Sequence, residues 1–431
     1  MPGALSSDST SRETTAATVE AVWRIESARL TGALARLTGD VGLAEDMAQD
    51  ALVAALELWP ESGVPENPAA WLMTTARNRG IDRIRRDANL NRKYGEIAAE
   101  MARSGPQPGP EAVADTEDRI GDDVLALLFT ACHPALSADS QVALTLKAVG
   151  GLSTGEIARA FIVPKATVSQ RIVRAKRTLA DSQIPFETPG MDEMASRLAA
   201  VLGVIYLIFN EGYAATAGDS WMRKDLSNEA LRLGRILVGL AADEPEVHGL
   251  LALMEIQASR FPARTGKGGA PVLLMEQDRN LWDRLLIRRG LEQLDRALEL
   301  GGDGPYVLQA SIAACHARAT RAEHTDWDEI VRQYELLANQ NRTPVTELNR
   351  AVAISMAGDP SRALIIVDGI AGSGKLKGYH LLPAVRGDLL DRLERHTEAA
   401  GEFRVAAELT GNEQERRVLL ARAEQAESFS R

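Results

Sequence analysis

The sequence has little cysteine, few aromatic side chains and no long apolar run. Its only cysteines, Cys132 and Cys315, cannot build a disulfide framework and fit a reducing compartment. Aromatic residues make up 4%, while alanine, leucine, arginine and glutamate dominate, which favours helices. The longest apolar run, residues 198–209, is too short to span a bilayer, and the polar N-terminal segment lacks the layout of a secretory signal. We therefore expect a cytoplasmic protein that does not enter a membrane.

Basic charge is also scarce, because 49 Lys and Arg stand against 60 Asp and Glu, for a net charge of −11. Two windows depart from this acidic average. Residues 77–93 hold seven basic and two acidic residues, and residues 165–177 hold five basic residues and no acid. Each window carries +5, so the rest of the chain carries −21. Such confinement to two helix-like segments is typical of nucleic-acid binding and predicts contacts with two separated DNA elements.

Helical periodicity without a convincing strand pattern predicts an all-α protein, with two small helical domains before a helical-hairpin array. Composition breaks give the boundaries. We expect a disordered leader over 1–17, a first domain over 18–98, a linker over 99–121, a second domain over 122–182, a linker over 183–190 and the array over 191–431.

The last third of the chain repeats weakly at 36 residues. Ala351 and Ala363 are 12 residues apart, as are Gly387 and Ala399. Small residues at this spacing let the two helices of a hairpin approach closely, as in a tetratricopeptide repeat. An irregular helical bundle is the alternative for this region.

Residues 153–177 fit a helix-turn-helix. Ser153 and Glu156 have the spacing of a capping box, which starts the first helix, and residues 161–164 supply the turn before Pro164 opens the second. One face of that second helix is apolar, at Val168, Ile172, Ala175 and Leu179. The outward positions suit base edges and phosphates: Lys165, Thr167, Ser169, Gln170, Arg171 and Arg174. The alternative is an ordinary amphipathic hairpin with a solvated basic face.

The first basic window lies in a helix predicted over about residues 69–89. Taken alone, its arginines fit any basic helix. A longer pattern is more specific: Asp40-x4-Glu45-Asp46-x2-Gln49-Asp50, Trp59, Pro68-x2-Trp71-Leu and Ala76-Arg-Asn78-x2-Ile81-Asp82-x2-Arg85-Arg86 resemble sigma region 2. Residues 153–179 resemble sigma region 4. Over about residues 18–182 the chain is therefore similar to an extracytoplasmic-function sigma factor of bacterial RNA polymerase.

This resemblance implies partners and roles for the matching positions. Core RNA polymerase would bind the segment that contains Asp46 and Gln49. Asn78 would hold a base flipped from a melted −10 region of promoter DNA, with anchors on nearby phosphates or bases at Arg77, Arg79 and Arg83. A flipped base needs both a pocket and such anchors, because leaving the stack costs a few kcal/mol. The outward residues of the helix at 165–177 would read the double-stranded −35 element.

The C-terminal part, residues 191–431, resembles the helical, tetratricopeptide-like extension of one subgroup of these factors. The resemblance is carried by residues 204–213, Trp282-Asp-Arg and residues 378–382. It implies regulation in cis and leaves open an unknown protein or ligand partner. Asn210, Glu211, Tyr213 and Trp282 could line a ligand groove, although a satisfied polar cluster inside the helical core is the favoured interpretation.

No catalytic arrangement rises above background, so we expect no enzyme activity and no cofactor. The adjacent Cys-His pairs lack zinc-ligand spacing, so no metal is expected. Gly369-x4-Gly374-Lys375 lacks the hydroxyl residue and preceding strand of a phosphate-binding loop.

Two other functions remain open from sequence. One is a self-sufficient helix-turn-helix transcriptional regulator with a helical ligand- or protein-sensing domain. The other is a scaffold whose basic helices are incidental. The Asp46/Gln49 segment and the helix around Asn78 distinguish these from a sigma factor, because a plain repressor needs neither.

Overall fold

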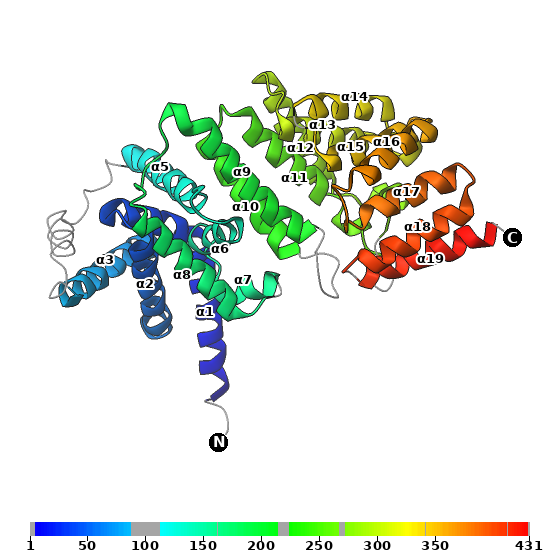
Figure 1. Cartoon of the computed structure of the whole chain (residues 1–431). Helices are drawn as coiled ribbons and strands as arrows, with labels where there is room; N and C mark the ends of the chain where they lie inside the picture. The colour runs from blue at the N-terminus through cyan, green and yellow to red at the C-terminus, as the bar shows by residue number, and fades with distance from the viewer. Residues whose placement is uncertain are drawn as a thin grey trace. The chain divides into compact units, whose positions relative to one another are not determined.

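The computed structural model describes residues 5–87, 113–161, 163–213, 224–266, 272–340, 342–411 and 413–429. Within these ranges the elements are α-helices and short 3-10 helices, which confirms the all-α prediction (Figure 1). The chain divides into two compact units, Met1–Ile205 and Tyr206–Arg431. Helix α9 (Met191–Tyr213) contains the point of division.

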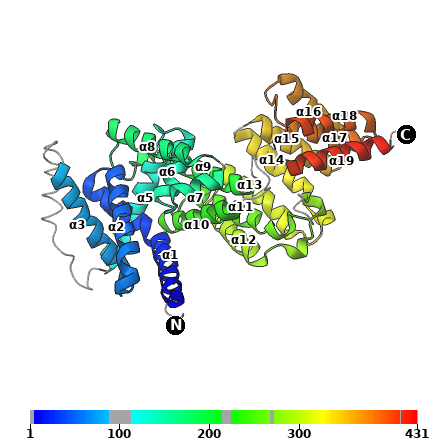
Figure 2. The same cartoon turned by 90° about the horizontal axis from the view of Figure 1, so that it is seen from below.

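The first unit begins with three helices that lie side by side in both views, α1 (Leu5–Thr38), α2 (Val41–Ser62) and α3 (Pro68–Asp87) (Figure 1 and Figure 2). Gly39, with a φ of 67°, allows the turn after α1. Asp40 then caps α2, its side chain accepting a hydrogen bond from Leu43 N at 3.0 Å. Helix α1 begins at Leu5, where we expected a disordered leader, because no proline or glycine interrupts residues 5–31.

Four helices follow in the same unit: α5 (Val113–Ala131), α6 (Ala138–Ala148), α7 (Thr154–Phe161) and α8 (Lys165–Asp181). Of the expected linker over 99–121, residues 99–112 lie outside the described ranges, and the remainder already belongs to α5. The break expected over 183–190 is present between α8 and α9.

Cys132 lies just after α5 and is buried, with its Sγ 3.4 Å from Thr145 Oγ1 on α6. Leu127 and Leu128 of α5 and Leu144 of α6 are fully buried as well. Cys315, in the second unit, is also buried and unoxidised.

The second unit is a series of helices after the end of α9. They are α10 (Lys224–Leu240), α11 (Pro245–Ala258), α12 (Arg284–Glu299), α13 (Pro305–Arg318), α14 (Trp327–Gln340), α15 (Pro344–Met356), α16 (Pro360–Ser373), α17 (Leu381–Arg392), α18 (His396–Leu409) and α19 (Glu413–Phe429). Helix α12 starts at Arg284. Asp283 caps it by accepting hydrogen bonds from Leu285 N and Leu286 N, and a 3-10 turn precedes it.

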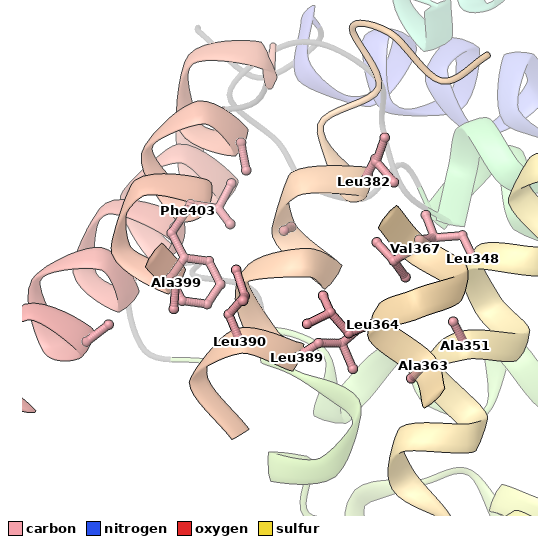
Figure 3. Close-up of a cluster of buried hydrophobic side chains, with 14 of the residues drawn as sticks. Leu348, Ala351, Ala363, Leu364, Val367, Leu382, Leu389, Leu390, Ala399 and Phe403 are labelled. Carbon is pink, nitrogen blue, oxygen red and sulfur yellow. The ribbon is translucent and has the colours of Figure 1, made fainter. Parts of the chain in front are cut away.

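The small residues of the 36-residue repeat lie inside two neighbouring helical hairpins, α15–α16 and α17–α18. Ala351, Ala363 and Ala399 are fully buried (Figure 3). A Cβ atom built on Gly387 would lie 2.7 Å from the Phe403 ring, closer than side chains pack. The repeat thus marks the places where paired helices approach closely.

Candidate nucleic-acid interface

The helix-turn-helix segment forms as its sequence predicts. Ser153 N donates to Glu156 Oε2 (2.7 Å) and Glu156 N donates to Ser153 Oγ (3.2 Å), so the capping box is closed in both directions. Pro164 occupies the N-cap position of α8. The buried side chains of α8 are those that the spacing selected, Val168, Ile172, Ala175 and Leu179.

The candidate DNA-reading residues of α8 differ in exposure. Lys165, Gln170 and Arg174 are exposed, whereas Thr167, Ser169 and Arg171 are partly buried. Arg171 is drawn to α6, its Nη2 lying 2.7 Å from Asp139 Oδ2. Asp139 is 67% exposed, so this surface pair contributes little and Arg171 can turn toward a phosphate or a guanine edge. Val173, which sequence reasoning did not assign, is exposed on the same helix and offers an apolar contact for a thymine methyl group.

On α3, Asn78 is exposed, and Arg77 and Arg79 are partly buried. Arg79 reaches toward α2, where its Nη1 donates to Asp50 O at 3.1 Å and its Nη2 lies 3.8 Å from Glu57. The α3 backbone continues through position 83, but the Arg83 side chain and residues 88–93 of the basic window lie outside the description. The candidate base-holding residue Asn78 is therefore accessible, and Arg79 is tied to the neighbouring helix.

Close packing fixes α3 against α2. A Cβ atom on Gly80 would lie 2.2 Å from Met47 Cε, so only glycine permits this approach without a shift of Met47. The Trp59 and Trp71 rings meet edge to face, with centroids 5.3 Å apart. Asn78, two residues before Gly80, is consequently held on a well-packed helix pair.

The two candidate polymerase-binding residues lie on α2, and one of them is engaged within the chain. Lys176, on α8, places its Nζ 2.9 Å from Asp46 Oδ1 and 2.5 Å from Glu45 Oε2. A second cation, Lys147 on α6, lies 3.3 Å from Glu45 Oε1. Burial by itself would lower the pKa of Lys176, but attraction and hydrogen bonding to Glu45 and Asp46 outweigh it, and that pKa is raised. Gln49 is partly buried nearby in sequence.

Two further contacts join α1 to the segments around the helix-turn-helix. Trp23 Nε1 donates to Gly151 O at 3.0 Å. Arg36 Nε donates to both carboxylate oxygens of Asp123, at 2.9 and 3.1 Å. Within the first unit, the region before residue 88 and the region after residue 112 are thus joined by charged and polar contacts.

The residues that join these regions were not predicted. Lys176 was part of a basic window but received no role, and Glu45 was noted only as part of the sigma-like pattern. One signal in the sequence was the pair of adjacent acids, Glu45 and Asp46, because Glu45 lies among the otherwise apolar buried positions of α2.

Comparison with known proteins identifies the family. The sequence model for sigma-70 region 2 matches residues 24–89, and the one for sigma-70 region 4 matches residues 126–179. An ECF RNA polymerase sigma factor of Mycobacterium tuberculosis, SigL, is 32% identical over 165 residues, which are 38% of this chain and 88% of that protein. The chain belongs to the extracytoplasmic-function sigma factors. It is an alternative sigma factor that directs transcription initiation, and its region 2 and region 4 domains imply binding to core RNA polymerase and promoter DNA.

A second relative, a probable ECF RNA polymerase sigma factor of Mycobacterium tuberculosis, SigI, is 27% identical over 170 residues, which are 38% of this chain and 56% of that protein. Sigma factors are not a catalytic family. None of the helices in the described ranges combines the length and the apolar character needed to cross a membrane.

A third relative matches the C-terminal extension as well as the two sigma regions. An uncharacterized protein of Rhizobium meliloti is 44% identical over 396 residues, which are 89% of this sigma factor and 90% of that protein. The sequence model of a family of unknown function (DUF6596) matches residues 197–298. The extension therefore recurs in a relative of nearly the same extent, as expected for the subgroup that carries one.

Proposed function

We propose that this sigma factor binds core polymerase through Asp46 and Gln49, opens the −10 region with Asn78 on α3, and reads the −35 element with the outward face of α8. Arg77, Arg79 and Arg83 would anchor the DNA around Asn78. The observation that carries the proposal is the contact between Lys176 and Asp46. Through it α8, the helix expected to read DNA, is bound to α2, the helix expected to bind polymerase. We call this contact, together with the bonds to Glu45, the Lys176 lock.

The Lys176 lock is incompatible with simultaneous reading of both promoter elements. The −10 and −35 positions differ by about 25 base pairs, or about 85 Å of straight duplex at about 3.4 Å per pair. In the locked form, Asn78 and Arg174 are linked by a short chain of direct contacts. Gly80 packs on Met47, its neighbour Asp46 binds Lys176, and Arg174 lies two residues away.

That path spans at most about 40 Å, given helix geometry and side-chain length. In the locked form, the distance from Asn78 to Arg174 is therefore at most about half of the distance between the −10 and −35 elements. We infer that α8 leaves α2 when the factor binds polymerase, and that polymerase groups replace Lys176 on Asp46. The free factor would be unable to read both elements, so that promoter recognition depends on polymerase.

The test is direct binding of core polymerase to fluorescent sigma variants. Gln49→Ala removes a proposed polymerase contact without touching the Lys176 lock, so it should weaken binding by roughly tenfold, the loss of about 1.4 kcal/mol. Asp46→Ala removes a proposed polymerase contact, which weakens binding, but it also removes a partner of Lys176, which favours the open form. Its net loss of polymerase affinity should therefore be smaller than the loss of the polymerase contact alone would cause. Glu61→Ala, at an exposed position of the same helix, is the matched control. Equal binding of the wild type and Gln49→Ala would contradict the assigned polymerase contact.

We propose further that the C-terminal helices regulate the factor in cis, in the cytoplasm, and that they take a protein or ligand partner. One support is that residues 191–205 of α9 belong to the first compact unit, where Arg197 Nη2 donates to Phe129 O at 3.0 Å. A truncation should therefore end after Ile205. We expect the truncated chain to lose run-off transcription activity with core polymerase, because α9 is continuous with the array. Unaltered transcription by residues 1–205 would contradict regulation by the extension.

A further inference from the structure

Three arginines of the second unit gather on aromatic rings. The guanidinium carbons of Arg260 and Arg279 lie 5.6 and 5.0 Å from the centroid of the Trp282 ring. Arg264 stacks on Tyr213, its guanidinium carbon 3.4 Å from that ring centroid. The two groups are joined by Gln257, whose Oε1 accepts hydrogen bonds from Tyr213 Oη (2.7 Å) and from Arg260 Nη1 (2.9 Å). We call these residues the arginine cluster.

The hydrogen-bond partners of Arg260 and Arg279 are neutral. Arg260 donates to Gln257 and Gln277, and Arg279 donates to the carbonyls of His316 and Ala319 and to Thr325 Oγ1. Among the described residues neither arginine has a carboxylate within 4 Å, and Glu323 is the acid whose longer-range attraction acts on Arg279. Arg279 is only 5% exposed. Burying cations without a nearby anion costs several kcal/mol, so Arg260 and Arg279 are short of negative charge.

Polar hydrogens of the same cluster also lack acceptors. In the described part of the chain, Arg279 Nε and Trp282 Nε1 are buried without a hydrogen-bond partner. Trp282 is 3% exposed. His316, whose carbonyl accepts from Arg279, adds no further positive charge to this group. Burial and then the charges of Arg260 and Arg279 lower its pKa to about 3, so its ring is neutral at pH 7.

A purely structural role accounts for only part of this arrangement. Arg279 Nη1 closes the C-terminal end of α13 by donating to His316 O and Ala319 O (both 2.7 Å), a common use of arginine. That role needs neither Arg260 over the same indole ring nor an indole N–H without an acceptor. An oxyanion would satisfy both, because guanidinium groups bind carboxylate and phosphate oxygens through paired N–H groups.

We propose that the arginine cluster is a binding site for the oxyanion, phosphate or carboxylate, of a small molecule. Arg260, which is only partly buried, and Arg279 would supply the charge, and the Trp282 indole N–H would supply a further donor. The site lies within residues 197–298, for which the matching family has no known function. It gives the C-terminal extension a ligand-binding role that is independent of the DNA-binding surfaces.

The test is calorimetric titration of the full-length protein with inorganic phosphate and, separately, with succinate, at ionic strength matched with chloride. We expect saturable binding at one site for at least one of the two, and the comparison tells a phosphate ligand from a carboxylate ligand. Arg260→Gln should weaken this binding at least tenfold. Trp282→Phe keeps a ring in place and removes the donor, so it should weaken binding severalfold. Arg288→Gln is the control, because Arg288 is exposed and pairs with Glu292 one turn along α12.

Circular dichroism melting of each variant without ligand separates lost binding from lost folding. If Trp282→Phe fails to fold, Arg260→Lys replaces it, since lysine keeps the charge but not the paired N–H groups. Absence of saturable binding of both anions to the wild type would overturn the proposal. So would binding that Arg260→Gln leaves unchanged. The assay uses neither polymerase nor DNA, so its outcome is distinct from that of the proposed promoter-reading function.

Discussion

Replacing Lys176 by glutamine removes the cation that joins α8 to Glu45 and Asp46. The side chain of Lys176 is 18% exposed and that of Glu45 only 6%, so this part of the Lys176 lock is largely shielded from solvent. Removing one member of a fully buried pair costs about 3–5 kcal/mol. Here Lys147 still lies 3.3 Å from Glu45, and Asp46 is 43% exposed. We therefore expect the locked form to lose about 2 kcal/mol relative to the open form.

A loss of about 2 kcal/mol corresponds to a shift of about 30-fold in the equilibrium between locked and open forms. If polymerase binds only the open form, Lys176→Gln should bind core polymerase up to about 30-fold more tightly than the wild type. Fluorescence anisotropy of labelled sigma factor titrated with core measures this. Arg177→Gln is the matched control, because Arg177 neighbours Lys176 but is 81% exposed and pairs with Asp181 of its own helix.

The pH dependence provides a second check. The pKa of Lys176 is raised above 10.5, so its charge, and the stability that it contributes, is fully present below pH 10.5 and is lost only as the pH rises through the raised value. The difference between Lys176→Gln and the wild type should therefore be constant between about pH 6 and pH 9. Unchanged or weaker binding of a folded Lys176→Gln protein would refute the lock.

Three other predictions follow from single sites. Gly80→Ala should destabilise the first unit by about 1–3 kcal/mol in chemical denaturation, because Met47 must move, and unchanged stability would contradict that packing. Asn78→Ala should slow opening of the −10 region yet spare closed-complex formation, because a flipped base is held only after melting, whereas Arg174→Ala should weaken closed-complex formation through the −35 element by about 1–3 kcal/mol; the same defect in both variants would contradict this division. His316 has a depressed pKa of about 3, so its neutral form contributes stability that is present above pH 6.5 and decreases as the pH falls toward 3. His316→Phe should therefore lose less stability than the wild type between about pH 7 and pH 5 by thermal denaturation, and equal losses would count against it.

Local features of the fold could be predicted from the sequence because their causes are local. The capping box of Ser153 and Glu156 and the buried face of α8 depend on residues within one or two turns. The small residues at Ala351 and Ala363 predicted a close hairpin for the same reason. Each of these rests on a spacing that helix geometry alone fixes.

The Lys176 lock could not be predicted because its partners are 130 and 131 positions apart and neither is unusual by itself. The hydrogen bond from Arg79 to α2 could not be predicted for a similar reason. The sequence of a basic helix face is the same whether its arginines bind DNA or a carbonyl of a neighbouring helix. The start of α1 at Leu5 was missed because its polar composition outweighed the absence of helix breakers.

Both thiols of this sigma factor are buried, which lowers their reactivity. Burial raises the pKa of Cys132 from 9.0 to about 12 and that of Cys315 to about 11. The thiolate is the form that oxidants and electrophiles attack, and raising the pKa by about three units reduces its fraction about a thousandfold. Neither cysteine is therefore suited to sense peroxide or disulfide stress directly. If this factor responds to oxidative conditions, the two thiols are poorly suited to receive that signal.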